Sequence, residues 1–433
     1  MEIFVEVMGG DLQAALDTVA AAGGGTVFLR PGRHHAGPIR LSDNVTLHIE
    51  ENAVLAFAPD YKQYGSNTVS VLAEASNRAY IVAQNARNIA LVGKGTIDGG
   101  GDAFHTGFDA SVGTFTPFAE RPRVLVLEDC QDIRLEDVQI TDSPMWTIHL
   151  VRCRNIAVHG VRVSNNRQLP NTDGIVIDSC SDVTITGAVI RTADDGICLK
   201  TSFSEKEIGR CERITVSDSV IESKSCALKI GTESFGDITE VSFLRCRIEN
   251  SNRGLGIFSR DGGKVENVVF RDIEVDCSET PDGFWGSGEP FTITKLTRRP
   301  ERPAGTVCKV LVENISGRCQ GAVNLFAEEP GGIDNVVLRA STLRMEEGPL
   351  GTARQYDLRP TNADLAPPKG TEGRGNAWVR AEDGNIVGLF AYPGGLPGVF
   401  AQNVTGLEIE NVTIDRPRPL PAGWNSATIT LVP

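Results

Sequence analysis

The chain has 433 residues, of which 40% are hydrophobic and 23% charged, the composition of a soluble folded protein. Its 42 basic and 56 acidic residues give a formal net charge of −14 without any basic run, so we expect no nucleic-acid partner. No stretch of eighteen apolar residues occurs, so we expect no membrane span and no membrane partner.

The first predicted element is an amphipathic helix over residues 11–23. Before it, Glu2 and Glu6 stand where a secretory leader carries positive charge, so we expect a cytoplasmic protein. The apolar stripe of the helix consists of Leu12, Ala15, Leu16 and Val19. The glycines from Gly23 to Gly25 end it. Because helical periodicity is almost absent after residue 30, we expect this helix to cap the first coil of a β structure.

A repeat then runs along the chain. Cysteines open four similar phrases, CQDIRLEDVQI, CRNIAVHGVRV, CSDVTITGAVI and CERITVSDSVI, at positions 130, 153, 180 and 211, which lie 23, 27 and 31 residues apart. Apolar residues alternate within each phrase, which indicates short strands with one buried face. Such spacing indicates a solenoid or a propeller, and its variation favours a β-helix, in which extra residues form loops. We therefore predict an all-β fold, a single-stranded right-handed parallel β-helix.

The same pattern predicts one domain over residues 1–433. Further coils follow in ITEVSFLRCRIENSNRGLGIFS, VENVVFRDIEVD, VCKVLVENISG, IDNVVLRAS and VTGLEIENVTIDRP, whereas the glycine- and proline-rich residues 343–400 predict an irregular excursion. The ten cysteines include no C-x-x-C pair, so a zinc site has little support. We interpret the recurring cysteines as a stacked ladder of small apolar side chains rather than as disulfides.

Two aspartate phrases stand out from the repeat: Asn171-Thr172-Asp173-Gly174 and Ala193-Asp194-Asp195-Gly196. Asp173 and Asp195 are 22 residues apart, about one coil, so stacking at roughly 4.8 Å would place them on neighbouring rungs of one face. We align the inward positions of these coils as Ile177, Leu199, Leu228 and Ile257, at spacings of 22, 29 and 29.

Three carboxylates this close cannot all ionise cheaply, so at least one should hold its proton near neutral pH. Hydrolysis of an acetal needs one protonated and one ionised carboxyl group, because the acid protonates the leaving oxygen while the carboxylate activates water. The competing interpretation is that both phrases are ordinary Asp-Gly turns. Calcium has less support, because no D-x-D-x-D-G loop is present, and we expect neither a metal nor a cofactor.

The order of these motifs resembles the polygalacturonase-type glycoside hydrolases (glycoside hydrolase family 28). The resemblance runs from about residue 11 to 275 and includes LVGKGTIDGGG, SPMWTIHLVRC, NTDGIVIDSC and ADDGICLK. It implies that Asp194 is the general acid and that Asp173 and Asp195 hold and deprotonate the water. It also implies an inverting reaction, with Asn171 orienting either Asp173 or a sugar hydroxyl.

The chain departs from this family at two phrases. Ser225-Cys226-Ala227 stands where the family has Gly-His-Gly, and Gly256-Ile257-Phe258 stands where it has Arg-Ile-Lys. The family's Arg and Lys grip a galacturonate carboxylate, so the change removes two charge-assisted contacts, each worth roughly 1.5–3 kcal/mol. We therefore do not expect plain polygalacturonate as the substrate.

Several side chains are candidates to compensate. Lys229, which we expect to project outward beside Lys200, and Lys200 itself could contact a carboxylate or hydroxyl, and Phe258 could stack on a sugar ring. Arg253, with Arg260 and Asp261, either lines the cleft or belongs to an ion pair in a turn. A structural role is the favoured interpretation of His149. For Trp146, the sequence leaves a sugar platform and an interior position equally open.

The sequence thus predicts an inverting glycoside hydrolase that acts on a pectin-related or similar oligosaccharide. Two alternatives stay open: a saccharide-binding β-helix without catalysis, and another β-helix carbohydrate enzyme, a lyase or an epimerase. The sugar, the linkage, exo or endo action and the oligomeric state are not specified by these patterns.

Overall fold

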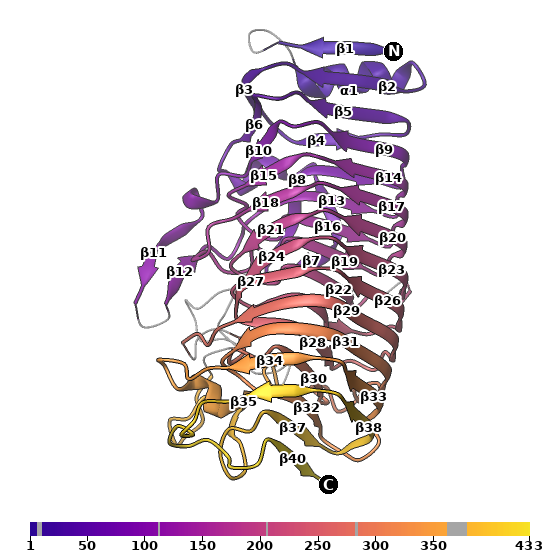
Figure 1. Ribbon diagram of the computed structural model, residues 1–433. Helices are drawn as coiled ribbons and strands as arrows, with labels where there is room; N and C mark the ends of the chain where they lie inside the picture. Colours follow the sequence, from indigo (N-terminus) through magenta and orange to yellow (C-terminus); the bar gives the residue numbers. More distant parts are fainter. Residues whose placement is uncertain (7–10, 111–112, 205–206, 282–284, 362–378) are drawn as a thin grey trace.

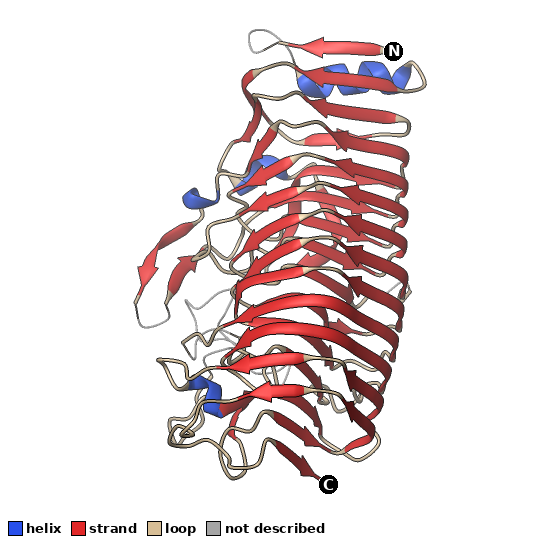
Figure 2. Ribbon diagram, in the orientation of Figure 1, coloured by secondary structure: helices blue, strands red, loops and turns tan. Residues whose placement is uncertain are grey.

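The computed structural model describes residues 1–6, 11–110, 113–204, 207–281, 285–361 and 379–433. It is a parallel β-helix, as the repeat predicted, with coils stacked along one axis from the N-terminal to the C-terminal end (Figure 1). Helix α1 (Leu12–Ala21) lies at the N-terminal end beside the first strands, with Leu12, Leu16 and Val19 buried (Figure 2). Asp11 caps it by accepting a hydrogen bond from the Ala14 backbone. None of the described helices combines the length and the apolarity needed to cross a membrane.

Each central coil contributes one strand to each of three parallel ladders. The first ladder contains β1 (Glu2–Val5), β2 (Gly25–Leu29), β5 (Val45–Ile49), β9 (Arg87–Val92), β14 (Gln131–Glu136), β17 (Arg154–His159), β20 (Ser181–Thr186), β23 (Cys211–Ser217), β26 (Ile238–Leu244), β29 (Val265–Cys277), β31 (Val307–Cys319), β33 (Ile333–Arg339) and β38 (Val404–Glu410).

The second ladder joins the first through the long strands β29 and β31. Its other strands are β3 (Gly32–Ala36), β6 (Ala53–Phe57), β10 (Thr96–Asp98), β15 (Gln139–Thr141), β18 (Arg162–Ser164), β21 (Val189–Thr192), β24 (Val220–Ser223), β27 (Arg247–Ser251), β34 (Thr342–Met345) and β39 (Thr413–Asp415).

The third ladder carries the outward side chains discussed below. It contains β4 (Ile39–Leu41), β8 (Ser76–Gln84), β13 (Arg123–Glu128), β16 (Ile148–Val151), β19 (Ile175–Asp178), β22 (Ile197–Thr201), β25 (Cys226–Ser234), β28 (Arg253–Ser259), β30 (Phe291–Lys295), β32 (Val323–Ala327), β37 (Val399–Gln402) and β40 (Ile429–Val432).

Short elements decorate this frame. They are the antiparallel strand β7 (Thr68–Ala73) on β8, the hairpin β11 (His105–Asp109) and β12 (Thr114–Pro117), the pair β35 (Gln355–Asp357) and β36 (Leu389–Ala391), and the 3-10 turns η1 (Tyr61–Tyr64), η2 (Gly101–Ala103) and η3 (Thr352–Arg354). The β35–β36 pair belongs to the predicted excursion over 343–400, of which residues 362–378 lie outside the described residues.

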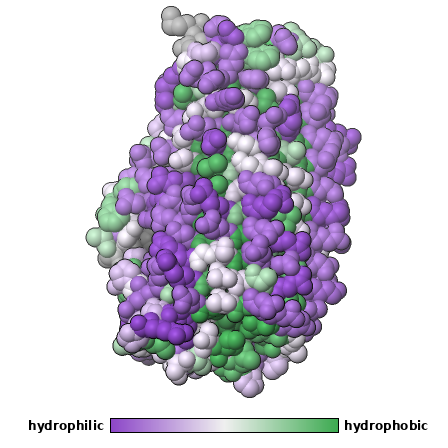
Figure 3. Space-filling model, in the orientation of Figure 1, coloured by the Kyte–Doolittle hydropathy of each residue, from purple (hydrophilic) through white to green (hydrophobic). Residues whose placement is uncertain are grey.

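The alternation seen in the sequence corresponds to the two faces of each strand. Inward residues are buried and stack from coil to coil, while the surface is mainly hydrophilic (Figure 3). The cysteines form part of this core: the backbone N–H of Cys130 donates to Sγ of Cys153, and that of Cys153 to Sγ of Cys180, at 3.4 and 3.3 Å. All ten cysteines are thiols.

One element of the predicted register is wrong. Leu199 pairs with Ile230, and Ile230 pairs with Ile257, whereas Leu228 pairs with Ile197. The true spacing between Leu199 and its partner is therefore 31 residues rather than 29, because the loop between β22 and β23 adds length that alternation alone cannot assign. Leu228 still points inward, since a slip of two residues keeps the face of a strand.

Candidate active site

A pocket opens where the loops before β19, β22, β25 and β28 meet the outer face of the third ladder. Its volume is about 210 Å³. Its lining consists of Glu74, Trp146, Asn171, Asp173, Asp194, Asp195, Lys200, Lys229, Thr232, Glu233, Arg253, Phe258, Trp285, Arg298, Arg359 and Pro360. All eight site residues predicted from the sequence are thus brought to one place, although lining a pocket does not by itself define their roles.

Backbone hydrogen bonds between coils position the three aspartates. The Gly174 N–H donates to the Asp195 carbonyl, and the Gly196 N–H donates to the Cys226 carbonyl, both at 2.9 Å. A Cβ atom on Gly174 would lie 2.5 Å from the Gly196 carbonyl oxygen, and one on Gly196 would lie 2.5 Å from the Ala227 carbonyl oxygen. Each aspartate is therefore followed by glycine because the neighbouring coil leaves no room for a side chain there.

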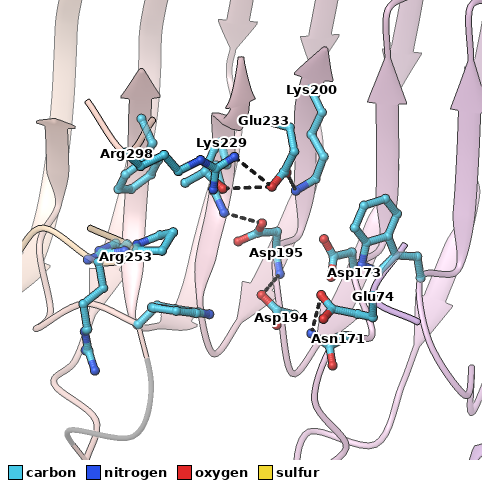
Figure 4. A pocket seen from close by; sticks show the side chains of 16 residues that line it. Glu74, Asn171, Asp173, Asp194, Asp195, Lys200, Lys229, Glu233, Arg253 and Arg298 are labelled. Atoms are coloured by element: carbon cyan, nitrogen blue, oxygen red, sulfur yellow. Dashed lines mark hydrogen bonds and ion pairs between the residues drawn. The ribbon is translucent and has the colours of Figure 1, made fainter. Parts of the chain in front are cut away.

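The carboxylates of Asp173, Asp194 and Asp195 gather at the centre of the pocket (Figure 4). Oxygen atoms of Asp173 and Asp195 lie within 4.8 Å of each other and of the Cys198 sulfur. Asp194 accepts a hydrogen bond from the Asp195 backbone at 3.0 Å. Burial, together with the nearby Asp194 and Asp195, raises the pKa of Asp173 well above its usual range. At least one proton is thus held in the cluster near neutral pH.

Lys229 forms an ion pair with Asp195. Its Nζ lies 2.6 Å from Oδ2 of Asp195, and the Ser225 hydroxyl donates to Oδ1 at 2.9 Å. Burial lowers the pKa of Lys229, but the charges of Asp195 and Asp194 and the hydrogen bond to Asp195 together raise it above its usual range. Lys229 pairs along the sheet with Cys198 and Gly256, so Lys200 is its diagonal neighbour on β22, and both lysines line the pocket. The corrected register places Lys229 directly beside the aspartates.

Lys200 belongs to a separate ion pair on the same wall. Its Nζ lies 2.6 Å from Oε2 of Glu233 and 4.9 Å from the centre of the Trp146 ring. Arg298 approaches the other oxygen of Glu233 at 3.5 Å. Burial lowers the pKa of Lys200, but Glu233 and the other acidic groups nearby together raise it well above its usual range. Trp146 therefore lies at the pocket surface rather than inside the coil.

Asn171 and Glu74 form the opposite wall (Figure 4). Asn171 donates to Oε1 of Glu74 at 3.1 Å and accepts from Nη2 of Arg121 at 2.8 Å. Glu74 lies at the partly exposed rim of the pocket. Burial of its carboxyl group raises its pKa to about 7, although the positive charge of Arg121 lowers it. These contacts fix the orientation of the Asn171 side chain.

Arg253 and Phe258 form the third side, next to the excursion. Arg253 pairs with Asp357 at 2.8 Å, and Asp357 also pairs with Arg359 at 2.9 Å. The Phe258 ring is only 1% exposed and packs against the cations of Arg253 and Lys229, 5.0 and 5.4 Å from its centre. Stacking of Phe258 on a sugar ring stays a prediction.

The remaining candidates lie behind the pocket. Asp261 is fully buried and pairs with Arg298 through both oxygens, at 2.8 and 2.7 Å. Arg260 donates to the Thr294 carbonyl at 2.8 Å. His149 lies between Nη1 of Arg123 at 2.7 Å and Asp178 at 3.3 Å, and burial lowers its pKa to about 4. It is a neutral, buried histidine below the lining.

Sequence reasoning missed seven lining residues, two of them, Thr232 and Glu233, on β25 itself; the other five are Glu74, Trp285, Arg298, Arg359 and Pro360. Glu233 carried a usable signal, because it alternates outward with Lys229 along β25. The other five come from segments outside the repeat, for which the sequence contained no signal of proximity. Asp173, Asp195 and Cys198 together offer donor atoms that a metal ion could use, but Lys229 already neutralises one oxygen of Asp195.

Comparison with known proteins gives consistent matches. The sequence pattern of glycosyl hydrolases family 28 matches residues 44–321. A probable polygalacturonase of Vitis vinifera is 26% identical over 64% of this chain and 58% of its own length. A polygalacturonase of Juniperus ashei is 23% identical over 63% of this chain and 54% of its own length. The chain thus spans little more than half the length of these curated relatives.

Solved structures agree in fold. An exopolygalacturonase from Thermotoga maritima superposes with a TM-score of 0.64 at 22% identity, covering 77% of this chain and 82% of that chain. An endo-xylogalacturonan hydrolase from Aspergillus tubingensis gives a TM-score of 0.54 at 16% identity, covering 99% of both chains. At these identities the likeness concerns the β-helix itself. Because the family match covers more than half of the 433 residues, the chain belongs to glycosyl hydrolases family 28.

Proposed function

We propose that this protein is an inverting glycoside hydrolase that cleaves pectin-related oligosaccharides, with Asp173, Asp194 and Asp195 as its catalytic residues. The supporting observation is the gathering of three carboxyl groups in one pocket, where burial and the neighbouring aspartates raise the pKa of Asp173. Family membership supports hydrolysis of a glycosidic bond. Similar proteins are named as a polygalacturonase and an endo-xylogalacturonan hydrolase, which supports a pectin-type substrate.

The proposed reaction uses the carboxyls in different protonation states. Asp194, as the acid, donates a proton to the glycosidic oxygen while the bond from that oxygen to the anomeric carbon breaks. A water molecule attacks the anomeric carbon from the opposite face and gives its proton to Asp195, which Lys229 keeps charged. Asp173, which holds a proton in the empty pocket, positions that water through a hydrogen bond. The products are two shorter saccharides, one with an inverted anomeric centre.

The pocket walls favour short substrates. Trp285, Arg359 and Pro360 close the side next to the excursion, so the end of a saccharide chain fits better than its middle. The absence of the family's Arg-Ile-Lys phrase argues against plain polygalacturonate. Exo-action on an oligosaccharide is therefore part of the proposal.

Replacement of the proposed acid tests this assignment. Asp194→Asn should lower turnover by roughly a hundredfold or more, because an amide cannot donate a catalytic proton. Release of reducing sugar is to be measured on galacturonides, rhamnogalacturonan fragments and aryl glycosides, with Asp182→Asn, an exposed aspartate paired with Arg213, as the matched control.

The outcomes separate the competing functions. Turnover that survives Asp194→Asn would contradict the catalytic assignment. Binding of these saccharides without any release of reducing sugar would favour a non-catalytic saccharide-binding protein. A product that absorbs in the ultraviolet through a new double bond would indicate a lyase.

A further inference from the structure

We propose that Glu233 occupies the place of a substrate carboxylate, so that the subsite beside Asp195 accepts an uncharged sugar and rejects a uronate. This inference rests on the proposed function, because it names the class of sugar that the same pocket takes.

Glu233 is held as a bound carboxylate would be. Lys200 and Arg298 approach its two oxygens separately, at 2.6 and 3.5 Å. The Lys200 and Arg298 side chains are 5% and 8% exposed, whereas that of Glu233 is 30% exposed and faces the pocket. Two cations that converge on one carboxylate are the usual means of recognising an acidic ligand. Here the protein supplies the carboxylate itself.

The other cations of the lining are engaged in the same way. Lys229 contacts Asp195 at 2.6 Å, and Arg253 and Arg359 contact Asp357 at 2.8 and 2.9 Å. Among the residues that the structure describes, each lysine and arginine of the lining therefore contacts a protein carboxylate. A uronate would have to displace one of these carboxylates or share its cation.

Electrostatics favours the same conclusion. Burial alone would raise the pKa of Glu233, but Lys200 and Arg298 outweigh it and hold the pKa well below its usual range. Glu233 is therefore charged at neutral pH and repels a second carboxylate. A neutral sugar meets no such repulsion, because its hydroxyl groups can donate to the carboxylates and accept from the cations.

Binding of matched sugars tests the inference without relying on turnover. Galactose and galacturonate, glucose and glucuronate, and mannose and mannuronate are titrated by calorimetry into the full chain. Each pair differs only in the carboxylate at carbon 6. At least one neutral sugar should bind more tightly than its uronate partner. Failure of every neutral sugar to do so overturns the inference, whether or not the protein hydrolyses a glycoside.

Variants of Glu233 provide the second arm. Glu233→Gln should increase the affinity for the uronate by roughly tenfold or more, because Lys200 loses its carboxylate partner and can pair with the uronate, while Arg298 stays on Asp261. This gain should shrink as salt is added. Glu233→Asp retains the charge and should show no gain. Glu222→Gln is the matched control, because Glu222 also contacts two cations, Arg167 and Arg191, outside the pocket.

Thermal unfolding of each variant shows whether it is folded. If Glu233→Gln is folded and the uronate affinity does not rise, the inference is wrong. If Glu233→Gln does not fold, Glu233→Ser is tested in its place under the same criteria, since it also removes the charge.

Discussion

The residues of the pocket show why the two short Asp-Gly phrases specify the position of the carboxyl groups. Gly174 and Gly196 are required because the next coil's carbonyl oxygens come too close for any side chain. The aspartates beside them then emerge on successive rungs, where burial and mutual repulsion raise the pKa of Asp173. Lys229 offsets the charge of Asp195, so the cluster combines a protonated and an ionised carboxyl.

The burial of Asp173 beside two other carboxyl groups should lower the free energy of unfolding at neutral pH. Because the folded-state pKa of Asp173 is raised, its contribution to stability is greatest below its unfolded pKa and is lost as pH rises through the folded value. At neutral pH, Asp173→Asn should therefore raise the midpoint of thermal unfolding, by roughly 2 °C or more for a chain of this size, while abolishing activity. The gain should be smaller at pH 4 than at pH 8.

Asp178 is the matched control with the opposite sign. It is equally buried, but its hydrogen bonds with His149 and Ser202 together outweigh burial and lower its pKa. Asp178→Asn should therefore destabilise the protein at neutral pH, since it removes a favourably placed carboxylate. A loss of stability for Asp173→Asn at pH 8 would show that the ionised Asp173 carboxylate does not destabilise the folded state.

At the scale of elements, the coils are held in register by inward stacks of equivalent residues. The cysteine phrases predicted this stacking, and the thiols of Cys130, Cys153 and Cys180 do follow one another in the core. The slip at Leu228 shows the limit of such reasoning: alternation specifies the face of a strand, but pairing between strands specifies the partner.

The ladder predicts a simple pattern of thiol reactivity. Nine cysteines are buried and Cys308 is partly exposed. Burial raises the pKa of the Cys211 thiol to about 12, which disfavours the reactive thiolate. Ellman's reagent should therefore label one thiol in the folded protein and ten in guanidinium chloride. Cys308→Ser should abolish labelling of the folded protein; rapid labelling that persists in this variant would contradict the stacked core.

At the scale of the whole molecule, the solenoid provides one long face and the excursion provides a wall at one side of the pocket. Asp357 on β35 joins the two parts, because it pairs with Arg253 on β28 and with Arg359. All three side chains are almost completely buried, so this contact fixes the position of the Arg359–Pro360 wall.

Loss of the Asp357 charge should make the Arg359–Pro360 segment less firmly held. Asp357→Asn removes the buried carboxylate that Arg253 and Arg359 share, and breaking a buried ion pair typically costs about 3 kcal/mol or more. We expect a lower midpoint of thermal unfolding and faster cleavage by trypsin within residues 343–400, located by mass spectrometry. Asp383→Asn, in the same excursion but bonded only locally to Asn385, is the control and should leave the cleavage rate unchanged. Equal cleavage of both variants would show that Asp357 does not anchor the wall.

The sequence by itself determined the β-helix, the stacking of its core and the convergence of Asp173, Asp194 and Asp195. These features follow from a repeat, and a repeat places equivalent residues above one another whatever the loops do. Tertiary structure alone decided the partner of Lys229, the pairing of Glu233 with Lys200 and Arg298, and the wall formed by Arg359. Lys229 and Glu233 lie in a repeat coil, but their register against β22 depends on the pairing of the strands, and Arg298 and Arg359 lie in loops outside the ladders. Only packing in three dimensions therefore brings these groups together.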